Sequence, residues 1–363
     1  MTADKIHIDL ALQGGGAHGA FTWGVLDRLL EDERLQLDGI SGTSAGAMNA
    51  VVLANGYQDG GPEGARSALC GFWKAVSDAA LFSPLQRTVV DRALGRWTMD
   101  TSPGYQLFEL ATSLVSPYQF NPFDINPLRD LVSAMVDFDK VRACTALKLF
   151  VSATSVRTGR PRTFRSTEIS LDVVMASACL PQVFRAVEVH GEPYWDGGYT
   201  GNPALFPLVE ETDANDLLIV QINPMQRKEL PRTAAEIMNR LNEITFNASL
   251  ISEINTLLLL KDLVKTQHVG LTRYADMCLH HISAERELQP LDVSSKLNVE
   301  WDFLQFLHGV GRDTASRWLE RHFHCLRKES TLDAAALVCR EPGYDIEPGL
   351  RRHLDRGMGD TDK

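Results

Sequence analysis

The chain has 363 residues and a mass of 40.2 kDa, enough for one large domain with an extension or for two domains. Its 44% apolar and 23% charged residues are typical of a water-soluble globular protein. The net charge of −11 argues against a nucleic-acid partner, because phosphate binding needs a basic surface, and it disfavours purely electrostatic attachment to anionic lipid.

The sequence also argues against a membrane anchor, a leader and a structural metal site. No run approaches the roughly 18 consecutive apolar residues of a spanning helix, and the first residues lack the apolar core of a signal peptide. The cysteines show neither close pairing nor metal-ligand spacing, which indicates reduced, buried thiols. They are Cys70, Cys144, Cys179, Cys278, Cys325 and Cys339. We therefore expect a cytoplasmic protein that needs neither a metal ion nor another cofactor.

The first 55 residues predict an α/β fold. Apolar residues alternate from Ile6 to Leu12, which predicts a strand, and their spacing from Phe21 to about Leu35 predicts a helix. A weak strand at residues 37–41 and a helix at residues 45–55 follow. Alternating strands and helices joined by glycine-rich turns indicate a parallel sheet.

The rest of the chain continues this pattern after an irregular segment. Between residues 81 and 126, prolines interrupt the periodicity and aromatic residues are dense, so we expect an insertion against the rim of the core. Strands are predicted at residues 147–154, 183–189 and 217–222, and a short helix at residues 171–179. Long amphipathic helices are expected from Ile237 onward and over residues 300–326. We expect a main domain over residues 1–225, a helical extension over residues 230–345 and a loose tail over residues 346–363.

Two glycine-rich turns carry the first chemical signal. Residues 42–46 read Gly-Thr-Ser-Ala-Gly, the Gly-x-Ser-x-Gly turn that lifts a serine nucleophile off the end of a strand. Gly42 and Gly46 remove side chains where strand and helix crowd the turn, and the N–H of Ala45 would point toward an oxyanion next to Ser44. Residues 14–19 read Gly-Gly-Gly-Ala-His-Gly and offer backbone N–H groups to an anion. Together the turns predict acyl transfer.

The first turn has a competing interpretation. Gly14, Gly16 and Gly19 also match the fingerprint of a dinucleotide-binding fold, and Asp38 lies about 20 residues further on. That fold wants the acidic residue at the end of the second strand, whereas Asp38 is followed directly by the turn that holds Ser44. The two turns together favour hydrolysis over cofactor binding.

A serine nucleophile needs a base, and the sequence offers a carboxylate rather than a histidine. The histidines after Ser44 lie in no informative context, and His280 and His281 are expected in a strand. Asp196 is followed by Gly197 and Gly198, which let the backbone turn sharply and bring the carboxylate close to another segment. A carboxylate can deprotonate a serine when it lies within hydrogen-bond reach and burial raises its pKa. The alternative is an ordinary hairpin turn.

The ordered motifs resemble those of the patatin-like phospholipases. The resemblance rests on the two glycine-rich turns, on Ala-Ser-Ala-Cys-Leu-Pro at residues 176–181 and on Asp-Gly-Gly at residues 196–198, and it runs from about residue 6 to residue 222. It implies a three-layer α/β/α fold with a mainly parallel central sheet. It also implies lipid acyl hydrolysis by a Ser-Asp dyad without histidine or metal. The residues after about 230 resemble an extension found in some bacterial members.

Carried over residue by residue, the resemblance makes Ser44 the nucleophile and Asp196 the general base. The implied oxyanion hole and supporting motif residues are Gly14, Gly15, Gly16, Ala45, His18, Gly19, Gly42, Gly46, Gly197 and Gly198. The family usually has Arg or Lys where this chain has His18. We therefore expect His18 to face the anion pocket and to titrate near neutral pH.

The sequence thus predicts a serine ester hydrolase that acts on lipids, with an acyl-ester substrate and peripheral contact with membranes. Phospholipid, lysophospholipid, neutral glyceride and storage polyester all remain compatible as substrates. A catalytically weak lipid-binding or scaffold protein is the alternative. Because the aromatic insertion could reach the rim of the site, we expect a preference for medium or long acyl chains.

Overall fold

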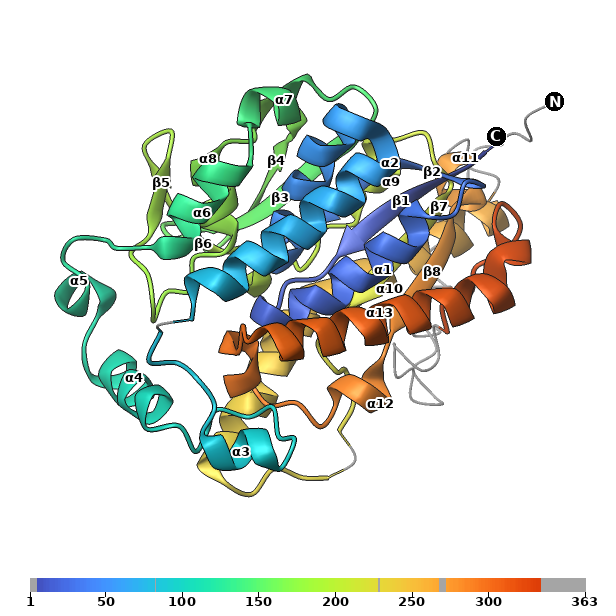
Figure 1. The fold of residues 1–363 in the computed structure, drawn as a ribbon. Helices are drawn as coiled ribbons and strands as arrows, with labels where there is room; N and C mark the ends of the chain where they lie inside the picture. Colours follow the sequence, from blue (N-terminus) through green and yellow to red (C-terminus); the bar gives the residue numbers. More distant parts are fainter. Residues whose placement is uncertain (1–4, 82, 228, 268–271, 334–363) are drawn as a thin grey trace, which may run out of the picture. The chain divides into compact units, whose positions relative to one another are not determined.

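A sheet forms the centre of the computed structural model, which describes residues 5–81, 83–227, 229–267 and 272–333 (Figure 1). Its strands, eight among these described residues, run in the order β5-β6-β3-β2-β1-β7-β8, with β4 also paired to β3. The sheet is parallel from β3 through β2, β1 and β7 to β8 and antiparallel where β4, β6 and β5 join it. The strands are β1 Ile6–Leu12, β2 Leu35–Gly42, β3 Lys148–Ser155, β4 Pro161–Arg165, β5 Val187–Val189, β6 Glu192–Asp196, β7 Asp216–Gln221 and β8 Cys278–Ser283.

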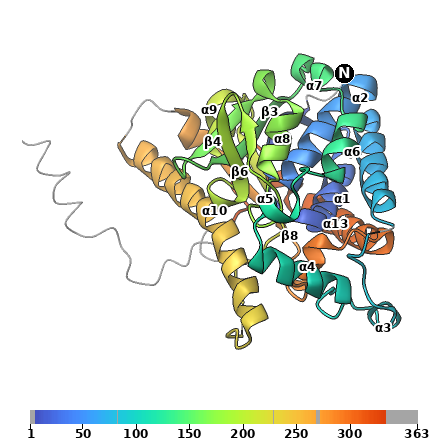
Figure 2. The same ribbon diagram turned by 90° about the vertical axis from the view of Figure 1, so that its left-hand side faces the viewer.

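Helices cover both faces of the sheet. In Figures 1 and 2, α1, α2 and α13 lie on one face and α10 lies on the other, which gives the predicted α/β/α layers. The helices are α1 Gly19–Leu30, α2 Ala45–Ala79, α3 Val89–Ala93, α4 Pro103–Leu114, α5 Pro117–Phe120, α6 Pro127–Met135, α7 Phe138–Ala143, α8 Leu171–Ser177, α9 Phe206–Glu211, α10 Ala234–Gln267, α11 Thr272–Asp276, α12 Glu285–Leu288 and α13 Trp301–His322.

The core extends from the first helix to the last. Every residue of α1 except Arg28 is buried, because α1 packs against both α2 and α13. At the crossing of α1 and α13, a Cβ added to Gly24 would clash with the His308 carbonyl, and one added to Gly311 would clash with the Phe21 carbonyl. The two helices therefore approach backbone to backbone, and residues beyond 300 complete the core of the N-terminal part.

The expected domain boundary near residues 225–230 lies inside one compact unit. Met1–Thr331 form this unit and Leu332–Lys363 form a second. β8 pairs with β7 in register from Asp216 opposite Cys278 to Gln221 opposite Ser283, and every residue of β7 is buried. The expected tail at residues 346–363 lies outside the described residues.

Several predicted elements differ in length from the observed ones. The helix expected to reach Leu35 ends at Leu30, because a turn stabilised by the Asp32 N–H to Leu29 carbonyl bond leads directly into β2. The helix expected at residues 45–55 continues to Ala79 with a kink at residues 60–61. The strand expected at residues 183–189 shrinks to β5, because Leu180 accepts turn hydrogen bonds from the two N–H groups at residues 183 and 184.

The segment between residues 81 and 126 contains three short helices, α3, α4 and α5, and no strand among its described residues. Prolines begin α4 and α5 at their first positions, where a missing N–H costs no hydrogen bond. No helix in the described ranges is both long enough and apolar enough to cross a membrane.

Candidate active site

Ser44 lies in a strained turn between β2 and α2. Its backbone angles are φ 54° and ψ −120°, a conformation that residues with a side chain rarely adopt. The Ser44 N–H donates to the Ser177 Oγ at 2.9 Å, and the neighbouring Thr43 hydroxyl donates to the Gly201 carbonyl at 2.6 Å. Two distant segments therefore hold the strained turn in place, with Ser44 only 8% exposed.

The glycines of the first turn allow it to lie against the second. A Cβ added to Gly14 would lie 2.8 Å from the Ser44 Cβ, and one added to Gly19 would lie 2.7 Å from the Ala45 Cβ. Both distances are below any normal carbon contact, so side chains at these positions would force the two turns apart. The two glycine motifs thus form one packed unit.

Gly42 and Gly46 close the serine turn itself. A Cβ on Gly42 would lie 2.6 Å from the Gly46 carbonyl oxygen, and one on Gly46 would clash with the Leu12 carbonyl of β1. The crowding predicted between strand and helix at this turn is therefore present in the structure.

Three backbone N–H groups near Ser44 are available to an anion. The N–H groups of Gly15, Gly16 and Ala45 donate no hydrogen bond within the described part of the chain. The N–H of Gly14 differs, because it donates to the Asn202 Oδ1 at 2.7 Å. Of the glycines expected to form an oxyanion hole, Gly15 and Gly16 thus have open donors, while Gly14 packs against the serine.

Asp196 ends β6 and is fully buried. Its Oδ1 accepts a hydrogen bond from the Gly198 N–H at 2.7 Å, while its buried Oδ2 has no partner of standard geometry among the described residues. Burial raises the pKa of Asp196 to about 7, although the Gly198 N–H, the Ser44 hydroxyl and the charge of Lys296 each oppose that rise. The Ser44 hydroxyl is therefore close enough to the carboxylate to lower its pKa, but the two groups do not have the geometry of a standard hydrogen bond. The fold brings Ser44 and Asp196 together.

The Asp-Gly-Gly segment is not an ordinary hairpin turn. Gly197 begins a 3₁₀ turn (Gly197–Tyr199), and a Cβ on Gly197 would clash with the Ser152 carbonyl of β3. A Cβ on Gly198 would clash with the ring of Phe246 from α10. The two glycines let the turn pass between β3 and α10, which places Asp196 inside the protein.

His18 does not have the environment expected of it. It is 3% exposed, its Nε2 lies 2.8 Å from the Ser295 Oγ, and its ring packs edge-on against Phe303. Burial and the nearby charge of Lys296 lower the pKa of His18 to about 3. The expectation that His18 titrates near neutral pH is therefore wrong, because residues from the far end of the chain cover it.

The structure adds residues that the sequence did not point to. Lys296 lies in a 3₁₀ turn (Ser294–Leu297), and its Nζ donates to Asn223 Oδ1 and Asn242 Oδ1, both at 2.8 Å. Asn202 links the Gly14 N–H to the Phe246 carbonyl, to which its Nδ2 donates at 3.0 Å. Asn202 follows the Asp-Gly-Gly motif closely, which is a weak signal, whereas Lys296 lies 100 residues beyond it and carries none.

The alternatives for a base and for a cofactor find no support in these contacts. His280 and His281 lie in β8 as expected, where His280 Nε2 contacts Asp216 Oδ1 at 2.9 Å and His281 Nε2 contacts Gln221 Oε1 at 2.6 Å. One oxygen of the Asp38 carboxylate, Oδ2, accepts the N–H groups at residues 213 and 214, so Asp38 stabilises a turn that precedes β7.

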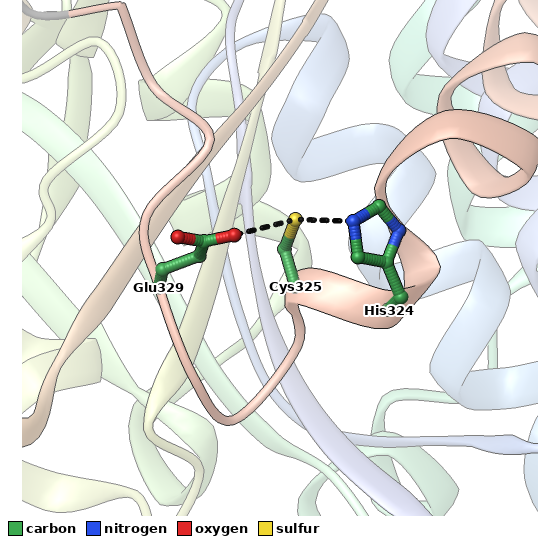
Figure 3. Close-up of side chains that lie close together, drawn as sticks. All are labelled: His324, Cys325 and Glu329. Carbon is green, nitrogen blue, oxygen red and sulfur yellow. Dashed lines mark hydrogen bonds between the residues drawn. The ribbon is translucent and has the colours of Figure 1, made fainter.

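One group of potential metal ligands exists among the described residues, formed by His324, Cys325 and Glu329 (Figure 3). The Cys325 thiol donates to Glu329 Oε1 at 3.3 Å and lies 3.5 Å from His324 Nε2. Burial, the hydrogen bond to Glu329 and the Glu329 charge all raise the pKa of Cys325, which favours the thiol over the thiolate. Cys70 is exposed, contrary to the expectation of burial, whereas Cys144, Cys179, Cys278 and Cys325 are buried as expected; Cys339 lies outside the described residues.

Comparisons with known proteins agree with the sequence motifs. The family model described as "Patatin-like phospholipase" matches residues 10–209. No curated protein sequence matches the chain. Among solved structures, VipD from Legionella pneumophila is 14% identical, with a TM-score of 0.40, over 88% of this chain and 67% of VipD. The type III effector ExoU is 15% identical, with a TM-score of 0.34, over 87% of this chain and 53% of ExoU.

A second structure of ExoU, in its heterodimeric complex with SpcU from Pseudomonas aeruginosa, is similar at 14% identity and a TM-score of 0.32. That match covers 88% of this chain and 52% of the other. The chain therefore spans about half the length of the ExoU chains and about two thirds of VipD.

Proposed function

Because the family model matches more than half of the residues of the chain, the chain belongs to the patatin-like phospholipase family, and we propose that it hydrolyses lipid esters through Ser44 and Asp196. One observation carries the proposal. A serine in a strained strand-to-helix turn lies beside a buried carboxylate whose pKa is raised to about 7, and the glycine-rich loop that packs on this serine has N–H groups that donate no hydrogen bond among the described residues.

The proposed reaction has two half-reactions. Ser44 Oγ attacks the ester carbonyl carbon while its proton passes to the Asp196 carboxylate. The tetrahedral intermediate then collapses, the bond from carbon to the leaving oxygen breaks, and Asp196 returns the proton to the leaving alcohol. Water attacks the resulting acyl-serine, Asp196 accepts one proton of that water, and the acid leaves as Ser44 regains its proton.

The open N–H groups are suited to stabilise the negative oxygen that forms in both half-reactions. Gly15 and Gly16 follow β1, and Ala45 begins α2, so the donors come from two elements packed on each other. Each donor directed at an oxyanion contributes on the order of 3 kcal/mol to transition-state stabilisation. These donors need no reorganisation, because packing already holds both turns.

Two solvent-exposed apolar stripes support a lipid substrate. On α4, Leu107, Leu110 and Leu114 are 56–74% exposed and lie on one face of the helix. On α10, apolar side chains near Ile237 and Leu241 are also exposed. Figures 1 and 2 both show α4 and the first half of α10 at the same end of the compact unit.

Helix α10 and the segment that follows α4 both contact residues close to Asp196. Phe246 of α10 packs on Gly198, and the Arg185 side chain donates to the carbonyls of Tyr118 and Pro122 at the end of α5. The Cys179 thiol donates to the Arg185 carbonyl, and the Asp196 N–H donates to the Cys179 carbonyl. We infer that acyl chains approach the site from this end and that the surface contacts neutral or zwitterionic lipid, since the net charge of −11 opposes anionic membranes.

A fluorophosphonate tests the proposal directly, because only an activated serine reacts with it. We expect the full chain to be labelled on Ser44, and we expect S44A to lose on the order of 10⁴-fold in kcat on a soluble ester. D196N is expected to be nearly as inactive, and the S44A/D196N double variant little worse than either single variant, because the pair acts as a unit.

S113A is the matched control, since Ser113 is an exposed serine of α4. An unlabelled wild-type protein that still binds lipid vesicles would instead identify a lipid-binding or scaffold protein. Equal hydrolysis by S44A and the wild type would remove Ser44 from the mechanism.

A further inference from the structure

A turn from the C-terminal part of the chain lies directly on the glycine-rich loop. The 3₁₀ turn Ser294–Leu297 contacts the 3₁₀ turn Gly16–His18, and a Cβ on Gly16 would clash with the Lys296 carbonyl. Ser295 of the same turn contacts His18. The loop that offers its N–H groups to an anion is thus covered by the segment that carries Lys296.

The ammonium group of Lys296 is held by neutral partners. It donates to the side-chain oxygens of Asn223 and Asn242 and lies 5.4 Å from the ring centre of Phe246. Among the described residues it forms no ion pair within 4 Å. Two of the three N–H donors of the ammonium group thus have neutral acceptors, which leave its charge uncompensated at close range, so that charge acts on groups further away.

Asp196 is one of those groups, because the Phe246 ring that lies 5.4 Å from the ammonium group also contacts the Asp-Gly-Gly segment, where a Cβ on Gly198 would clash with it. Its carboxylate is fully buried, an environment that favours the neutral acid, and the charge of Lys296 acts against this effect. His18 is another, since the same charge and burial together keep its ring neutral. The position that usually carries Arg or Lys in the resembling motif therefore holds an uncharged ring here. The ammonium group of Lys296 is connected to the same loop through Asn223, whose Nδ2 donates to the Gly14 carbonyl at 2.8 Å.

We propose that Lys296 is a positioning residue that keeps Asp196 ionised, and that it supplies from the C-terminal segment the positive charge that the glycine-rich motif of this chain lacks. The proposal rests on the proposed function and deepens it. It implies that two segments about a hundred residues apart in the sequence, one with Asp196 and one with Lys296, form the site together.

Other groups near Lys296 and Asp196 raise or lower the pKa values of these two residues. Glu243 of α10 attracts the Lys296 charge, Arg227 repels it, and burial lowers the pKa of Lys296 to about 8. Around Asp196, the Ser44 hydroxyl and the Gly198 N–H both favour the carboxylate, and the Asp196 charge in turn raises the pKa of the neighbouring Cys179 and Tyr199. None of these other groups is removed by the substitutions proposed below.

The test measures the rate of fluorophosphonate labelling from pH 5 to pH 9 for K296Q, K296R and the wild type. Gln keeps amide donors for Asn223 and Asn242 but has no charge, whereas Arg keeps the charge. Below the pKa of the base, the labelling rate falls tenfold per pH unit. We expect K296Q to move the acidic limb of the plot of labelling rate against pH upward by roughly one pH unit, with about tenfold slower labelling at pH 6. We expect K296R to leave this limb near its wild-type position.

N242D is a second variant that leaves Lys296 in place. A carboxylate at residue 242 would pair with the ammonium group and cancel its charge, so the acidic limb is expected to rise as in K296Q. K148Q is the matched control, because Lys148 begins β3 and forms an ion pair with the exposed Asp213. Its profile should match that of the wild type.

The outcomes separate the two proposals. A wild-type protein that does not label defeats the proposed function and, with it, the role of Lys296. A wild-type protein that labels, with acidic limbs of K296Q and N242D that coincide with its own, overturns the role of Lys296 and leaves the proposed function intact. A purely structural role would lower the rate equally at all pH values without moving the limb, which also overturns the proposal.

Discussion

The Asp196 carboxylate combines a proposed catalytic role with a cost in stability. Burial raises its pKa from 3.8 to about 7, so ionisation is harder in the folded protein than in the unfolded chain. A group whose pKa is raised by folding stabilises the protein below the unfolded pKa, and this contribution is lost as the pH rises through the folded pKa. The protein should therefore lose stability between about pH 4 and pH 7 through this residue.

We predict that D196N is inactive but more stable than the wild type at pH 8. The amide oxygen of the substituted side chain would still accept the Gly198 N–H, and the side chain would carry no buried charge. A shift of about 3 pKa units sets an upper limit of roughly 4 kcal/mol on the gain, which should vanish near pH 4. Thermal unfolding at both pH values measures this. S44A is the control, since it is also inactive but keeps the carboxylate; a D196N variant that unfolds below the wild type at pH 8 contradicts the prediction.

His18 illustrates how a residue type and its environment can disagree. An isolated histidine titrates near neutral pH, and its place in the motif suggested a switchable cation. The contacts with Ser295 and Phe303 bury the ring and lower its pKa to about 3, so His18 stays neutral across the working range. His18 therefore contributes no change of charge near neutral pH.

At the scale of elements, α4 is the clearest candidate for contact with acyl chains. Its first residue is a proline at N1, its Tyr105 is buried, and its leucines at residues 107, 110 and 114 face solvent along one stripe. Helices usually bury such a stripe. A lipid surface or a long acyl chain would cover it.

We predict that the triple variant L107S/L110S/L114S loses activity on long-chain esters while its activity on acetyl esters is unchanged. Each buried methylene contributes at most about 0.8 kcal/mol, so the wild type should gain up to roughly three orders of magnitude in kcat/KM between acetyl and octanoyl esters. The variant should show a flatter chain-length series and weaker sedimentation with phosphatidylcholine vesicles. E109A/S113A, on exposed positions of the same helix, is the control. A flat series in the wild type itself would leave no acyl-chain site to assign to α4.

At the scale of the whole compact unit, residues beyond 225 contribute to both the sheet and the site. β8 pairs with the edge of β7, and α13 packs on α1. Phe246 of α10 packs against Gly198. Lys296 reaches the glycine-rich loop from the same region. The family match ends at residue 209, so each of these contacts involves at least one residue outside the matched segment.

We predict that a chain truncated after residue 225 does not fold to an active protein. Truncation would expose the edge of β7 and the apolar face of α1, and an uncovered strand edge with an apolar face favours aggregation. Soluble yield and fluorophosphonate labelling measure the effect. A chain truncated after residue 345 is the control, since it keeps every described residue. A soluble, labelled 1–225 chain would show that the motif-bearing part is self-sufficient.

The sequence by itself determined the local parts of this protein. Alternation in β1, the turns at residues 14–19 and 42–46 and the Asp-Gly-Gly segment were predictable, because strand periodicity and turn chemistry are set by residues a few positions apart. Those motifs also pointed to Ser44 and Asp196, and the structure lays the two residues beside each other. Predicted element ends were less accurate, as with the helix that stops at Leu30 and the strand that shrinks to Val187–Val189.

Only the tertiary structure decided the electrostatics of the site. The burial of His18, the open N–H groups of Gly15 and Gly16 and the approach of Lys296 depend on segments hundreds of residues apart packing into one volume. No local pattern encodes such contacts, because desolvation and the charge at a carboxylate depend on every group around it in space. The sequence named the residues, and the packing of α10 and of the turn at residues 294–297 set their charge states.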